Sequence, residues 1–156
     1  MPGERTVTVA EETKPYVIFR LGDEEFGMDV MNIKEITKIT TITRVPHSAD
    51  FIEGVINLRG SLATVINLRK RLGFKPKEID ADSRIIIAEF EDNPVGMLVD
   101  AATEVLRIPV SNIDIEATPE MVTTEISKKY LMGVGKVENR LIILLDLKQV
   151  LAEKEG

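Results

Sequence analysis

Residues 51–68, with the sequence FIEGVINLRGSLATVINL, decide the fold because they recur later in the chain. The second occurrence is residues 130–147, YLMGVGKVENRLIILLDL. The spacing is 79 positions throughout, and it carries on to Lys148, which corresponds to Arg69. A match of this length at one fixed spacing indicates that the chain contains an internal repeat.

An earlier stretch is repeated in the same order. Residues 17–30, VIFRLGDEEFGMDV, match residues 86–99, IIAEFEDNPVGMLV, at a spacing of 69 positions. The second copy therefore carries ten more residues between its two blocks than the first copy does. We place them in the polar segment 109–129, which contains two prolines and is predicted to be a loop. Two blocks in the same order indicate a duplication.

The duplication predicts the architecture. Short runs of β-branched and other apolar residues, separated by turn residues, are typical of an all-β sandwich or barrel. Two small barrels side by side can bury a shared apolar interface and leave a groove between them. The predicted strands are residues 16–21, 26–30, 51–58, 62–68, 84–90, 95–99 and 141–147, with a helical turn or strand at 31–36, a connector at 75–83 and a short C-terminal helix at 148–154.

Composition narrows the class of function. The 156 residues carry a net charge of −6 and include no Cys or Trp. An acidic chain with 4% aromatic residues is a poor partner for nucleic acid, which is bound through basic side chains and stacking. Residues 1–14 are polar and lack a signal sequence, and no apolar run approaches the roughly 20 residues of a membrane helix. We expect residues 1–14 to be a disordered tail, and the protein to be cytoplasmic with no membrane insertion.

No catalytic or metal-binding pattern is present. His47 is the single histidine, it follows a proline in a polar turn, and no nucleophile motif accompanies it. Without a His or Cys pair the usual zinc sites are excluded, and Gly54 to Gly60 lacks the Lys-Ser/Thr ending of a phosphate-binding loop. We therefore predict a non-enzymatic binding protein with no cofactor and no metal. The alternative is a small-ligand-binding or catalytic double barrel that uses the groove between the barrels.

Differences between the two copies indicate candidate binding residues. Gly54 recurs as Gly133, which indicates a backbone requirement such as a bulge, a turn or a close approach. Asn57 and Arg59 belong to the first copy only. They are compatible with a tight hairpin turn, and equally with a guanidinium that binds a partner's acceptor groups. Residues 30–36 are compatible with core strand packing or with an apolar docking patch.

Three motifs together resemble the CheW family. They are LGDEEFGMDV at residues 21–30, Ile-x-Glu-Ile at residues 33–36 and FIxGVINLRG at residues 51–60. Residues 130–134 and 141–147 agree with the same pattern, and the resemblance covers about residues 15–152. It implies a single domain at 15–152, made of two intertwined five-stranded β-barrels.

The resemblance also implies function. Members of the family are adaptors that couple chemoreceptor cytoplasmic tips to the regulatory domain of the histidine kinase CheA. Carried over by position, the receptor-binding residues are Glu35, Gly54, Asn57 and Arg59, and the kinase-binding residues are Val30 and Ile33. A second contact within the signalling array falls on Glu120 and Met121.

Overall fold

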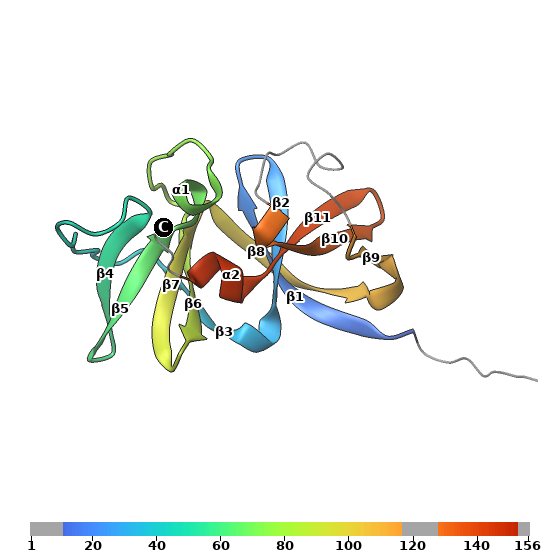
Figure 1. The fold of residues 1–156 in the computed structure, drawn as a ribbon, viewed down its shortest axis with the longest axis horizontal. Helices are drawn as coiled ribbons and strands as arrows, with labels where there is room; N and C mark the ends of the chain where they lie inside the picture. The colour runs from blue at the N-terminus through green and yellow to red at the C-terminus, as the bar shows by residue number, and fades with distance from the viewer. Residues whose placement is uncertain (1–10, 117–127, 153–156) are drawn as a thin grey trace, which may run out of the picture.

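The chain forms two β-sheets that lie side by side in the computed structural model, which describes residues 11–116 and 128–152 (Figure 1). Each sheet curls into a barrel. Barrel A contains, in spatial order, β8 (Ala101–Pro109), β1 (Thr13–Leu21), β2 (Glu24–Asp29), β11 (Arg140–Leu145), β10 (Leu131–Val137) and β9 (Ile113–Asp114). Barrel B contains β3 (Ile33–Lys38), β6 (Arg84–Phe90), β7 (Asn93–Val99), β5 (Ser61–Asn67) and β4 (Ile52–Leu58).

Short helices connect the strands, and one more follows the last strand. They are α1 (Leu68–Leu72), α2 (Leu147–Leu151) and the 3₁₀ turns η2 (Val30–Asn32), η3 (Val110–Asn112) and η5 (Lys128–Tyr130). Figure 1 places α1 and α2 between the two barrels. None of the helices in the described parts of the chain combines the length and the apolar composition that a membrane crossing requires.

Each barrel combines strands from both copies of the repeat. The hairpin β1–β2 is the counterpart of β6–β7, and β4–β5 is the counterpart of β10–β11. Nevertheless β2 pairs in parallel with β11, and β7 pairs in parallel with β5. The two copies have therefore exchanged their first hairpins, and neither barrel can form from one copy alone.

Two glycines lie where the barrels close. In barrel B the closing contact is an antiparallel bridge between Thr43 and Val55, and in barrel A it is the pairing of Asp114 with Val134. Gly54 and Gly133 each precede the bridged valine, and each lies at a β-bulge. A Cβ atom on Gly54 would lie 2.2 Å from the carbonyl oxygen of Thr43. The recurrence of glycine therefore reflects both a bulge and a close approach, as the comparison of the two copies predicted.

Alternation along the strands separates three apolar clusters. In β1, Tyr16 and Ile18 face the interior of barrel A, whereas Val17 and Phe19 face the space between the barrels. Phe19 is fully buried there and stacks on Phe26 with ring centroids 5.6 Å apart. Each such side chain stabilises the fold by about 1.5–3 kcal/mol when it leaves water. The central cluster draws on both barrels, so it holds them together as one unit.

Arg71 joins the two copies at their junction. Its guanidinium lies over the rings of Phe51 and Tyr130, at 4.4 and 5.4 Å from their centroids, and these two rings occupy corresponding repeat positions. It also donates hydrogen bonds to the carbonyl oxygens of Val150, at 2.8 Å, and Ala152. These two carbonyls belong to the end of α2, where a helix lacks internal partners. Arg71 thus fastens α2 to the first copy.

The fold class predicted from the sequence is confirmed, with two sheets of five and six strands and a short C-terminal helix. Several boundaries were wrong. Strand β1 begins at Thr13, inside the predicted tail, while residues 1–10 lie outside the described residues. Residues 31–36, predicted as a helical turn or a strand, contain both, since the turn η2 ends there and β3 begins. The sequence reasoning missed β8 entirely, and the predicted loop 109–129 contains η3 and β9 in its described part.

The helix α1 was also missed, because the preceding strand was extended to Leu68. Asn67 ends that strand, and its side-chain oxygen accepts a hydrogen bond from the backbone N–H of Lys70 at 3.1 Å. Asp146 occupies the corresponding position and caps α2 in the same way. Both residue types are strongly preferred as helix N-caps, so the repeat carried a signal for this helix.

Candidate docking surfaces

The β4–β5 hairpin presents Arg59 at its tip. Arg59 and Gly60 have φ values of 51° and 90°, which is the geometry of a two-residue turn with both central residues left-handed. The side-chain oxygen of Asn57 accepts a hydrogen bond from the backbone N–H of Gly60 at 2.9 Å. The interpretation of this stretch as a tight hairpin turn is therefore confirmed, and the turn leaves the Arg59 side chain 73% exposed.

Glu35 lies within reach of this turn because barrel B closes on itself. The guanidinium of Arg59 donates to both carboxylate oxygens of Glu35 across the barrel, from β4–β5 to β3. The hydrogen bond from Arg59 holds the pKa of Glu35 below its usual value. The pair is solvent-exposed, so its contribution to stability is small. It does fix the direction of a guanidinium that retains donors for a partner.

Leu62 lies opposite Asn57 in the β4–β5 ladder and is 68% exposed. We call Glu35, Asn57, Arg59 and Leu62 together the Arg59 surface. The sequence reasoning did not identify Leu62, although strand alternation carried the signal. Ala63 and Val65 are fully buried, so the period of two leaves Leu62 on the outside.

Gly54 is not part of this exposed surface. It is buried, and the contact with Thr43 described above accounts for the absence of a side chain. Three of the four predicted receptor-binding residues are thus exposed or half-exposed near one another, and the fourth supports the barrel from within. That Gly54 takes part in receptor binding stays a prediction, and its effect would act through the barrel and not through direct contact.

Val30 and Ile33 are half-buried and pack against the central cluster. The two interpretations of this segment are therefore both partly right, since each residue has one side in the core and another in solvent. Between them, Met31 is 83% exposed, and Ile36 is 40% exposed on β3. Glu120 and Met121 lie outside the described residues, so their predicted role stays a prediction.

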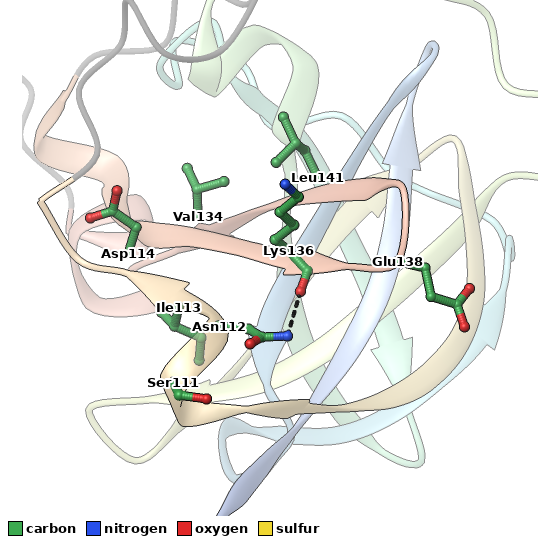
Figure 2. Close-up of a pocket in the computed structure, with 8 residues that line it drawn as sticks. All are labelled: Ser111, Asn112, Ile113, Asp114, Val134, Lys136, Glu138 and Leu141. Carbon is green, nitrogen blue, oxygen red and sulfur yellow. Dashed lines mark hydrogen bonds between the residues drawn. The ribbon is translucent and has the colours of Figure 1, made fainter.

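The corresponding part of barrel A contains a groove of about 750 Å³ (Figure 2). Its lining residues Lys136, Glu138 and Leu141 correspond through the 79-residue spacing to Asn57, Arg59 and Leu62. The apolar position is kept, with Leu141 50% exposed, but the charge at the turn is reversed. Figure 2 shows Glu138 and Asp114 at opposite ends of this groove. We call it the Glu138 groove.

One wall of the Glu138 groove is an incompletely paired strand edge. Strand β9 pairs only with Val134 and Gly135, so the next residue of β10 has no strand neighbour on that side. The carbonyl oxygen of Lys136 instead accepts a hydrogen bond from the side chain of Asn112 at 2.9 Å, drawn as the dashed line in Figure 2. A sheet edge of this kind is suited to contacts with another chain.

Asp100 connects the two barrels by its hydrogen bonds. It accepts from Nε and Nη2 of Arg69, at 2.9 and 2.7 Å, and from the backbone N–H of Gly22 at 2.7 Å. Gly22 belongs to the β1–β2 turn of barrel A, whereas Arg69 belongs to α1 beside barrel B. Burial raises the pKa of Asp100, but the bonds from Arg69 and Gly22 outweigh it, so the pKa lies below the ordinary 3.8.

We expect this carboxylate to give the protein an acid-sensitive stability. Because its pKa is lower in the folded chain, ionised Asp100 stabilises the fold above the unfolded pKa, and this contribution is lost as the pH falls below roughly 4. Asp100→Asn should lower the urea midpoint near neutral pH and reduce the difference between neutral and acidic midpoints. Asp23→Asn, at an exposed site in the neighbouring turn, is the control. Equal pH dependence of the wild type and Asp100→Asn would contradict the expectation.

Among the described residues no group of three or more His, Cys, Asp or Glu side chains is placed to hold a metal ion. His47 is exposed in the loop before β4 with a φ of 64°, and it lines a polar pocket of about 440 Å³ with Arg44 and Lys70. A further groove of about 460 Å³ lies where barrel A meets the connector of barrel B, and Asp100 lines it. The candidate docking sites described by the most contacts are therefore the Arg59 surface of barrel B and the Glu138 groove of barrel A.

A duplicated, hairpin-exchanged pair of β-barrels with exposed tips is the architecture of a CheW-like domain. The chain belongs to the CheW family, since the family described as CheW-like domain matches residues 15–155. The chemotaxis protein CheW of Bacillus subtilis is 39% identical over 142 residues, covering 90% of this chain and 87% of that protein. The chemotaxis protein CheW of Thermotoga maritima is 38% identical over 157 residues, covering 96% and 98%.

A solved structure agrees with the fold. The crystal structure of the scaffolding protein TtCheW from Thermoanaerobacter tengcongensis superposes with a TM-score of 0.81 at 35% sequence identity. The match covers 91% of this chain and 90% of that chain. The resemblance inferred from the sequence motifs is therefore confirmed.

Proposed function

We propose that the protein is a non-catalytic adaptor of bacterial chemotaxis, which couples chemoreceptor cytoplasmic tips to the regulatory domain of the histidine kinase CheA in the cytoplasm. Its relatives are named chemotaxis proteins, and the similar solved structure is a scaffolding protein. The observation that carries the proposal is that two separate segments each hold an exposed apolar side chain: Leu62 in the Arg59 surface, 68% exposed, and Met31 in η2, 83% exposed. Two such surfaces are expected of a protein that holds two different partners.

The Arg59 surface suits a receptor tip. A receptor tip is a helical hairpin, and a helix binds such a surface through apolar anchors and a few charged contacts. Leu62 offers the apolar anchor, and Arg59 is a multi-donor cation already oriented by Glu35. Arginine is enriched among the residues that dominate interface energies. We therefore assign Glu35, Asn57 and Arg59 to receptor binding, with Gly54 supporting the strand beneath them.

The kinase contact falls on the other exposed apolar segment, η2 and the start of β3. Val30 and Ile33 keep one side in solvent, and Met31 between them is the most exposed of the large apolar side chains described. Glu120 and Met121 complete this proposal as a second contact within the array. Signal transfer then requires only that the receptor's states differ in their preference for arrangements of the complex.

The alternative, a small-ligand or catalytic double barrel, has less support. A ligand or catalytic site brings several polar groups together around one enclosed position. In the groove where barrel A meets the connector of barrel B, Asp100 is already bonded to Arg69 and to the backbone of Gly22. In the Glu138 groove of barrel A the two carboxylates lie at opposite ends, and Lys136 lies between them (Figure 2). The Glu138 groove is therefore better suited to a macromolecular contact.

Size-exclusion chromatography of the full chain with the CheA regulatory domain and a receptor-tip fragment tests the proposal. We expect a binary complex with each partner and a ternary complex with both. A partner that displaces the other would contradict the assignment of separate surfaces. Failure of the chain to bind either partner would contradict the adaptor function itself.

A further inference from the structure

Met31 is exposed although its backbone is fixed. Its side chain is 83% exposed, the largest value among the exposed large apolar residues of the described chain. Its N–H donates to Oδ1 of Asp29 at 2.9 Å, the N-cap bond of η2, and Asp29 also pairs with Lys14 at 3.8 Å. The neighbouring Val30 packs against the central cluster. The exposure of Met31 is therefore a property of an anchored turn and not of a frayed end.

The second copy of the repeat fills the same position differently. The 69-residue spacing aligns Met31 with Asp100, which forms the ion pair with Arg69 at 2.7 Å, where each side chain is 16% exposed. The 79-residue spacing aligns Arg69 with Lys148. Met31 and Lys148 therefore occupy the positions that correspond to the largely buried ion pair of Asp100 and Arg69. Within the part of the chain that the structure describes, Lys148 forms no ion pair.

The first copy therefore lacks this internal contact and carries an exposed thioether in its place. An exposed apolar side chain on a fixed turn offers a contact for a partner at little entropic cost. A thioether adds chemistry that leucine or valine lacks, because peroxides convert it to the polar sulfoxide. Met28 and Met97 occupy corresponding positions in the two copies and are fully buried, so they are shielded from such a reagent.

We propose that Met31 is a peroxide-sensitive contact residue, whose oxidation to the sulfoxide weakens the binding of the kinase regulatory domain. This inference rests on the proposed function. In the step, the sulfur lone pair attacks one oxygen of hydrogen peroxide, the O–O bond breaks, and an S–O bond forms. Sulfur loses two electrons, and the second oxygen leaves as water after taking up the peroxide protons. The product places a strong hydrogen-bond acceptor against the apolar surface that the partner presents to Met31.

Calorimetry of the kinase regulatory domain with five forms of the full chain tests the proposal. The forms are the untreated protein, the protein treated with hydrogen peroxide, Met31→Leu with and without the same treatment, and untreated Met31→Gln. We expect about tenfold weaker binding for the treated wild type and for Met31→Gln, as for the loss of one interface anchor. Treatment should leave the affinity of Met31→Leu unchanged relative to the same variant without treatment. Peptide mapping should find Met31 oxidised before Met28 and Met97.

The controls separate the possible failures. Met132 is 43% exposed and remains in Met31→Leu, so weaker binding by treated Met31→Leu would assign the sensitivity to another methionine and overturn the proposal. Unchanged affinity after complete oxidation of Met31 would overturn it as well, while leaving the adaptor function intact. Absence of binding by the untreated protein would overturn the kinase contact itself. Binding to the receptor tip should be unchanged in all five forms.

Discussion

Replacement of Gly54 with alanine is expected to lower the free energy of unfolding by about 4 kcal/mol. The new Cβ atom would lie 2.2 Å from the carbonyl oxygen of Thr43 and 2.8 Å from a methyl group of Ile42. The residue has a φ of +153°, which L side chains rarely adopt. Backbone strain of this kind costs about 1–3 kcal/mol, and overpacking costs about as much again. The bridge that closes barrel B cannot survive unchanged.

Urea unfolding of Gly54→Ala measures this loss of stability. Alanine substitutions at two other glycines provide a comparison. Gly60→Ala has open space around its new Cβ atom and suffers only the strain of its φ of +90°, so we expect a loss of about 1 kcal/mol. Gly133→Ala has its closest contact at 3.0 Å and should fall between the two. A Gly54→Ala protein as stable as the wild type would show that the closing bridge is dispensable.

Arg59→Glu is expected to weaken binding of a receptor-tip fragment about 30-fold, the loss typical of a dominant interface residue. The variant places the new carboxylate of residue 59 beside that of Glu35, and it removes the only cation of the Arg59 surface. The fold should be preserved, because the residue is exposed and its turn geometry depends on Gly60 and Asn57. Calorimetry with the receptor tip measures the affinity, and circular dichroism checks the fold.

A charge swap separates the internal role of Arg59 from its role toward the partner. Glu35→Arg combined with Arg59→Glu restores an ion pair with the charges exchanged. If the partner binds the guanidinium at the hairpin tip, the double variant remains as weak as Arg59→Glu. Recovery of wild-type affinity would instead show that binding requires only an ion pair between positions 35 and 59, and not a guanidinium at the hairpin tip. Lys38→Glu makes the same change of charge on the exposed end of β3 and should bind normally.

Much of the candidate site could be predicted from the residues, and the exceptions have physical causes. Arg59 and Asn57 were identified because the second copy of the repeat lacks them. Leu62 was overlooked because an apolar residue in a strand suggests a buried one, whereas alternation puts it outside. Met31 was overlooked because its neighbours Val30 and Ile33 carry the apolar pattern. Their half-burial depends on the central cluster, which forms only when the two barrels meet.

Strand β8 shows why local pattern was insufficient. Ala101–Pro109 includes the exposed residues Thr103, Glu104, Val105 and Arg107, and only Ile108 is buried. A strand that buries so few of its side chains is specified by its partner, and β8 pairs with β1 along most of its length. Local propensity is a weak guide where the neighbouring strand provides the hydrogen bonds.

The sequence alone determined that the chain is duplicated, that it is rich in β-strands and that its two halves differ at one hairpin turn. Those properties are written in spacing and residue type, which need no knowledge of distant contacts. The tertiary structure decided that the halves exchange their hairpins, that Gly54 supports the barrel, and that Arg59 meets Glu35. Each of these depends on which segments, separated by tens of residues, lie beside each other. That choice is made by the shared core and by barrel closure, where burial and hydrogen bonding across the whole chain outweigh local preference.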